Sequence, residues 1–201
     1  MPLKVTLTDY GVGNLYSIRR SLENCGAEVS VITDMSELAD AECMVFPGVG
    51  AFDKTMERLL PHREMILSRL EAGVPALGVC IGMQIMFEGS DEGKSPGLGL
   101  IGGRVVPLEA KVVPHMGWNQ VDSDDPLMEG VVDNNFYFVH SFHGSPVDPG
   151  MTIGTTEYEG TTFPSFFRRY NAYGTQFHPE KSSLSGRRFL ENFIAFAEEQ
   201  A

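Results

Sequence analysis

The sequence predicts an α/β fold, with a mainly parallel central sheet flanked by helices and an antiparallel extension in the C-terminal half. Before residue 80, short apolar runs alternate with helix-length segments, which is the pattern of right-handed βαβ units. After residue 100, strand candidates follow one another closely with turn-forming residues between them, which favours hairpins. We find no repeat, linker or low-complexity tract, so residues 1–201 are expected to form one domain.

The N-terminal half is expected to supply the parallel strands and their helices. Strands are predicted at 3–8, 27–33, 43–46 and 74–79, each an apolar run. A helix is predicted at 15–24, ending at Gly26. A second is predicted at 52–72 with a break at Pro61, because proline cannot continue a helix. A helix-compatible run also spans 81–88.

The C-terminal half is expected to be rich in strands. The candidates lie at 102–106, 118–121, 135–139, 152–158, 165–169 and 172–177. An amphipathic helix is predicted at 187–200, because Phe189, Leu190, Phe193 and Ile194 recur on one side of it.

Composition narrows the classes of function. The chain has 201 residues, 42% of them hydrophobic, and a formal net charge of −12, which argues against nucleic acid or an anionic membrane as a main partner. Its three cysteines form no Cys-x-x-Cys pair, so a disulfide framework is not expected and a reducing compartment is. The N-terminus lacks a signal-peptide core, and no apolar run approaches the ~20 residues of a membrane span. A cytoplasmic location is therefore expected.

The run Gly78-Val79-Cys80-Ile81-Gly82 is the most informative segment. It follows an apolar strand and precedes a helix-compatible run, which is the setting of a nucleophile elbow. With cysteine at its centre, the expected chemistry is attack of a thiolate on a carbonyl. The alternative is a buried cysteine that ends a core strand, and the pentapeptide does not decide between the two.

A thiol nucleophile needs a base, and His178 is the strongest candidate of the five histidines. In an extended chain His178 and Glu180 point to the same side, so the carboxylate can orient the imidazole. The alternative is an exposed His-Pro-Glu turn. A zinc site through His140 and His143 is not expected, because no further pair of ligands completes a tetrahedral set.

Acyl transfer also needs donors to the developing oxyanion. The glycines of Pro47-Gly48-Val49-Gly50 allow the backbone N–H groups of Val49 and Gly50 to turn toward a ligand. The N–H of Ile81 follows the nucleophile and is the natural further donor. The alternative for the glycine segment is a plain tight turn.

Together these motifs resemble the class I (triad) glutamine amidotransferases, over nearly the whole chain. The resemblance rests on Pro-Gly-Val-Gly-Ala-Phe at 47–52, Gly-x-Cys-x-Gly-Met-Gln at 78–84 and Gln-Phe-His-Pro-Glu-Lys-Ser at 176–182. It implies the flavodoxin-like core of that family and hydrolysis of glutamine by Cys80, His178 and Glu180 through a glutamyl thioester. It also implies that Gly50, Gln84, His140 and Ser141 border the glutamine pocket, with no metal or organic cofactor.

Further blocks are similar to those of the glutaminase subunits of imidazole glycerol phosphate synthase, from histidine biosynthesis. They are Asp9–Leu15, His115–Asn119 and Tyr137–Ser141. The similarity implies a heterodimer with a separate cyclase subunit, a (β/α)8 barrel that uses the ammonia to make imidazole glycerol phosphate and aminoimidazole carboxamide ribotide. Asn14, Trp118, Tyr137 and Lys181 match positions near that interface.

Three other interpretations remain open. One is the glutaminase subunit of another triad amidotransferase, although the anthranilate and aminodeoxychorismate types usually carry Pro-Gly-Pro-Gly and lack the Gly-Trp-Asn block. A second is a stand-alone cysteine hydrolase. The third is a catalytically silent subunit that regulates a barrel enzyme.

Overall fold

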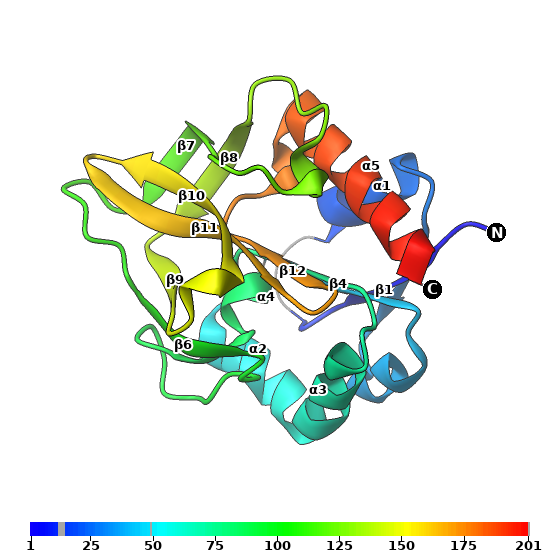
Figure 1. Ribbon diagram of the computed structural model, residues 1–201. Helices are drawn as coiled ribbons and strands as arrows, with labels where there is room; N and C mark the ends of the chain where they lie inside the picture. Colours follow the sequence, from blue (N-terminus) through cyan, green and yellow to red (C-terminus); the bar gives the residue numbers. More distant parts are fainter. Residues whose placement is uncertain (12–14, 49, 201) are drawn as a thin grey trace.

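A seven-stranded sheet forms the centre of the molecule in the computed structural model, which describes residues 1–11, 15–48 and 50–200. The strand order is β10-β11-β12-β4-β3-β1-β2 (Figure 1). Five strands run parallel: β1 (Lys4–Thr8), β2 (Glu28–Ile32), β3 (Cys43–Phe46), β4 (Ala76–Val79) and β12 (Ala172–Thr175). The other two, β10 (Thr152–Tyr158) and β11 (Thr161–Arg169), add an antiparallel edge. The predicted fold class is confirmed.

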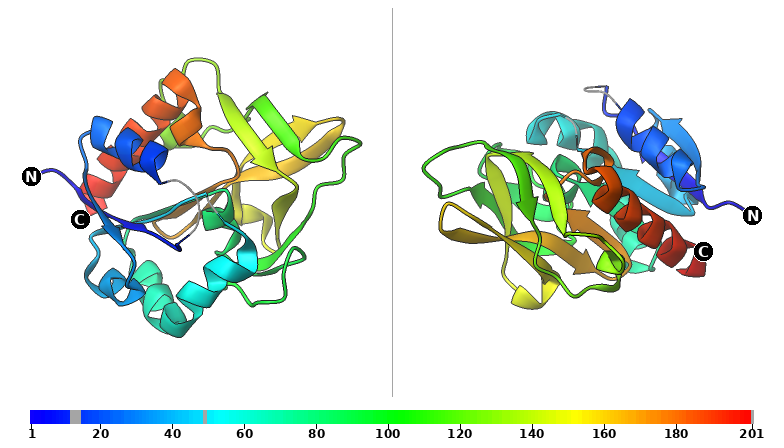
Figure 2. Two further views of the ribbon diagram at one scale, coloured as in Figure 1. Left: turned by 180° about the vertical axis from the view of Figure 1, so that it is seen from behind. Right: turned by 90° about the horizontal axis from the view of Figure 1, so that it is seen from above.

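Helices cover both faces of this sheet (Figures 1 and 2). On one face lie α1 (Tyr16–Asn24) and α5 (Ser183–Gln200), whose buried residues Leu22 and Phe193 belong to one apolar core. On the other lie α2 (Phe52–Leu59) and α3 (Arg63–Glu71), whose Met56 and Ile66 belong to a second core. The sheet therefore separates two cores, and its carboxyl edge is the place where loops from several strands meet. None of the described helices is long and apolar enough to cross a membrane.

Two smaller sheets extend from this layer. One contains β5 (Phe87–Ser90), β6 (Ile101–Pro107) and β9 (Phe142–Pro146), and the other pairs β7 (His115–Gln120) with β8 (Asn135–His140). The C-terminal strands outside β10 to β12 thus form separate sheets rather than lengthening the central one. Short 3-10 turns complete the chain at Met35–Asp40, Leu60–His62, Pro126–Met128, Pro149–Met151 and Pro179–Lys181.

The expected helix over 81–88 is wrong beyond its first turn. The helix α4 spans only Ile81–Gln84, and Phe87 begins β5. Phe87 pairs with Ile101 of β6 and packs edge-on against Phe167, with 5.3 Å between ring centroids. These long-range contacts outweigh the local helical pattern. The C-terminal helix begins at Ser183, earlier than the apolar periodicity indicates.

Candidate active site

Cys80 occupies a strained turn at the carboxyl end of β4. Its backbone has φ 49° and ψ −108°, a conformation that residues with a side chain rarely adopt. The turn is tight, because a Cβ at Gly82 would lie 1.9 Å from the carbonyl oxygen of Phe46, and one at Gly78 would lie 2.3 Å from that of Gly82. The Cys80 N–H donates to the carbonyl of Thr175 at 2.6 Å, which ties the turn to β12. The sequence folds here as a nucleophile elbow does.

His178 and Glu180 follow β12, the strand paired with β4. The His178 Nδ1 lies 2.8 Å from the Glu180 Oε1, and both side chains are buried. The His178 backbone N–H donates to the carbonyl of Tyr137 at 2.9 Å, which fixes the ring against β8. A Cβ at Gly48 would lie 2.7 Å from the His178 Cε1, so the ring position depends on glycine in the segment after β3.

The charges around His178 favour its protonated form. Burial alone disfavours a charged imidazole, but the negative charge of the neighbouring Cys80 and the Glu180 carboxylate outweigh burial and raise the pKa of His178 above its usual range. Its Nε2 is buried and makes no hydrogen bond to the described residues. That nitrogen is therefore available to take a proton from the thiol and to pass it on.

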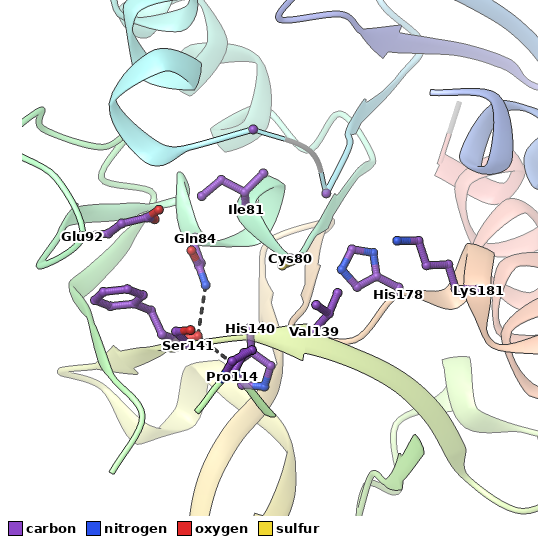
Figure 3. A pocket seen from close by; sticks show the side chains of 13 residues that line it. Cys80, Ile81, Gln84, Glu92, Pro114, Val139, His140, Ser141, His178 and Lys181 are labelled. Carbon is purple, nitrogen blue, oxygen red and sulfur yellow. Dashed lines mark hydrogen bonds between the residues drawn. The ribbon is translucent and has the colours of Figure 1, made fainter. Parts of the chain in front are cut away.

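A cavity of about 340 Å³ opens in front of Cys80 (Figure 3). The predicted pocket residues Gly50, Ile81, Gln84, His140 and Ser141 all line it, together with Cys80 and His178. Val49, the remaining expected oxyanion donor, lies outside the described residues. Three strand ends, those of β3, β4 and β12, thus meet at one cavity.

Glu92 also lines this cavity and was not singled out in the sequence. It lies in the loop after β5, across the cavity from His178 (Figure 3). Burial raises the pKa of its carboxyl group. The loop is held in place by Asp53, which accepts from the backbone N–H groups of Lys94 at 3.0 Å and Ser95 at 2.9 Å. In the sequence, Asp91-Glu92-Gly93-Lys94 has only the composition of a solvated turn.

Two further histidines lie behind the cavity wall as a neutral pair. The His115 Nδ1 and the His140 Nε2 are 3.1 Å apart. Burial lowers the pKa of His115 to about 4 and that of His140 to about 3, so neither is charged near pH 7. Within the described residues no cluster of three or more His, Cys, Asp or Glu could hold a metal ion.

The expected interface residues lie at different places. Trp118 of β7 and Tyr137 of β8 are cross-strand partners, and Trp118 is 51% exposed. Lys181 lines the rim of the cavity near His178. Asn14 lies outside the described residues.

Comparison with known proteins identifies the family. The glutamine amidotransferase class-I family model matches residues 6–196. The imidazole glycerol phosphate synthase subunit HisH of Halobacterium salinarum is 43% identical, over 98% of this chain and 94% of its own. The protein of the same name in Methanocaldococcus jannaschii is 43% identical, over 94% and 98%.

Solved structures show the same fold at lower identity. PurLQS from Thermotoga maritima superposes with a TM-score of 0.75 at 16% identity, over 98% of this chain and 99% of that one. A putative GMP synthase protein from Thermoplasma acidophilum gives 0.74 at 20%, over 99% and 96%. With its fold, its cysteine elbow and these relatives, the chain belongs to the class I glutamine amidotransferases and, within them, to the family of HisH subunits of imidazole glycerol phosphate synthase.

Proposed function

We propose that this chain is the glutaminase subunit of an imidazole glycerol phosphate synthase. It hydrolyses L-glutamine to L-glutamate and ammonia and delivers the ammonia to a separate cyclase subunit in histidine biosynthesis. The observation that carries this proposal is the strained Cys80 elbow beside the buried His178–Glu180 pair, at the base of one cavity. Residues 1–201 act as one domain of this type, located in the cytoplasm.

The arrangement supports a thioester mechanism. The His178 Nε2 takes the thiol proton, and the Cys80 sulfur attacks the carboxamide carbon of glutamine. The C–N bond then breaks, and His178 protonates the leaving ammonia. In the second half His178 takes a proton from water, whose oxygen displaces the sulfur and releases glutamate. Glu180 holds Nδ1 and stabilises the imidazolium.

Backbone N–H groups and polar side chains serve the substrate. The N–H groups of Ile81, Gly50 and Val49 stabilise the oxyanion, since developing negative charge is best met by preorganised donors. Gln84, His140 and Ser141 border the glutamine side chain and backbone. Glu92 is the carboxylate that faces the cavity opposite the triad, and it suits the α-ammonium group of glutamine.

Replacing Glu92 by glutamine is expected to raise the KM for glutamine about tenfold with little change in kcat, because a charged hydrogen bond to the substrate is lost in ground and transition states alike. Steady-state kinetics of glutamate release measures this. Asp91→Asn is the matched control: its exposed carboxylate pairs with Arg104 at 3.0 Å, outside the cavity, and its KM should not move. An unchanged KM in Glu92→Gln would remove Glu92 from the pocket.

The cyclase partner is a (β/α)8 barrel that forms a heterodimer with this chain. Two exposed apolar side chains on β7, Met116 and Trp118, support an interface there. Tyr137, paired with Trp118, and Lys181, at the cavity rim, extend the same region, and Asn14 contributes to it. The chain itself uses no metal or organic cofactor.

The partner is tested by measuring glutamine hydrolysis by the chain alone, with the cyclase, and with the cyclase and its ligand. We expect weak activity alone and a large increase in the liganded complex, with Cys80→Ala inactive throughout. High activity without a partner would instead identify a stand-alone hydrolase. No activity under any condition would identify a silent regulatory subunit.

A further inference from the structure

A buried amide contacts the nucleophile and has no part in the mechanism above. Gln176, directly after β12, is fully buried, and its Nε2 lies 3.5 Å from the Cys80 sulfur. Its backbone N–H donates to the carbonyl of Ser165 at 2.8 Å, so the residue is anchored to the sheet. A buried amide is costly unless both its ends are satisfied.

The orientation of this amide is set by a backbone carbonyl. The Gln84 Nε2 lies 3.1 Å from the carbonyl oxygen of Phe142, which can only accept, so Gln84 must turn its NH₂ group there (Figure 3). The same Nε2 lies 3.2 Å from the Gln176 Oε1. Gln176 therefore accepts from Gln84 through its oxygen and is left with its own NH₂ group toward the sulfur.

The Phe142 carbonyl is itself held from a second side. The His140 Nδ1 donates to it at 2.8 Å, so the His140 Nε2 must accept, and it does so from the His115 Nδ1. The His115 Nε2 in turn accepts from the Asn119 Nδ2 at 3.3 Å. Because burial keeps both imidazoles neutral, this direction of donation does not reverse near pH 7.

We propose that Gln176 is a further catalytic residue, which donates from Nε2 to the Cys80 sulfur and stabilises its thiolate, and that Gln84 is the positioning residue that aims it. When the thiol proton moves to the His178 Nε2, the Gln176 N–H remains on the sulfur and becomes a donor to an anion. Hydrogen bonds to charged groups are stronger than those between neutral groups, so the contact favours the state with the proton on His178. The proposal rests on the proposed function only in that Cys80 is the nucleophile.

The test follows the alkylation of Cys80 by iodoacetamide as a function of pH in the full-length chain, read by mass spectrometry. In Gln176→Met the rate at pH 7 should fall about tenfold, and the pH of half-maximal rate should rise by about one unit, because the donor is lost. Gln176→Glu should shift further in the same direction, since a carboxylate then faces the sulfur. Cys25, a half-buried thiol remote from this network, provides the internal control and should react equally in all variants.

A merely structural role for Gln176 would lower the melting temperature and leave the Cys80 pH profile in place, and that result would overturn the proposal. If Gln176→Met does not fold, Gln84→Met decides, because it frees the Gln176 amide to turn and should produce a smaller shift of the same sign. An unshifted profile there also overturns it. Since alkylation requires no glutamine, a shifted profile in a chain that fails to hydrolyse glutamine would refute the proposed function and leave this inference standing.

Discussion

Replacing Cys80 by glycine is expected to abolish glutamine hydrolysis and, compared with Cys80→Ala, to make the chain more stable. Both variants lose the sulfur, but only glycine relieves the backbone at φ 49° and ψ −108°. Such a conformation costs about 1–3 kcal/mol in a residue with a side chain. Glycine loses about 0.5–1 kcal/mol through the entropy of the unfolded chain. The net gain is therefore about 1 kcal/mol.

Urea denaturation of the two variants measures this difference, with glutamate release as the assay of activity. Cys80→Ala is the matched control because it keeps the Cβ that strains the turn. A glycine variant less stable than the alanine variant would mean that the elbow holds no strain.

Changing Glu180 to glutamine should lower kcat by about 10²–10⁴-fold, with a small change in KM. Glutamine keeps the shape of the side chain and removes the charge that orients His178 at 2.8 Å and stabilises its imidazolium. Steady-state kinetics in the liganded complex tests this. Glu23→Gln is the control, since this exposed carboxylate pairs with Arg19 on α1 and should leave kcat unchanged. A wild-type kcat in Glu180→Gln would show that the carboxylate is only structural.

The same variant has a signature in the dependence of stability on pH. His178 has a raised pKa in the folded state, so the folded chain binds this proton more tightly than the unfolded chain. The stabilisation is fully present below the unfolded pKa of about 6.5 and disappears as the pH rises through the folded pKa. The stability difference between wild type and Glu180→Gln should therefore be largest near pH 6 and should shrink toward alkaline pH.

Much of the fold can be predicted from the sequence where local pattern and tertiary contacts agree. The strands at 43–46 and 152–158 lie where their sequence patterns indicate. The strand β9 was missed because His143, Gly144 and Ser145 interrupt any apolar alternation, and it exists because it pairs with β6. The segment after Gln84 was misread for the same reason, since pairing with β6 decides its structure.

The candidate site divides along the same line. Cys80, His178 and Glu180 can be proposed from short motifs, because an elbow and the alternation of a strand are local properties. Glu92 and Gln176 carry no local signal. The bond from Gln176 to Cys80 joins residues 96 positions apart, and only the pairing of β12 with β4 brings them together.

The order of strands in the central sheet also determines when the thiol can become reactive. Along the described chain β12 is the last strand to be synthesised, yet it lies in the middle of the sheet, between β4 and β11. On a ribosome the elbow emerges first, and its base and both buried partners arrive only when β12 inserts. Pairing between such distant segments is slow compared with local folding. A nascent or incomplete chain thus carries an unassisted cysteine, and glutamine is spared from hydrolysis until the sheet has closed.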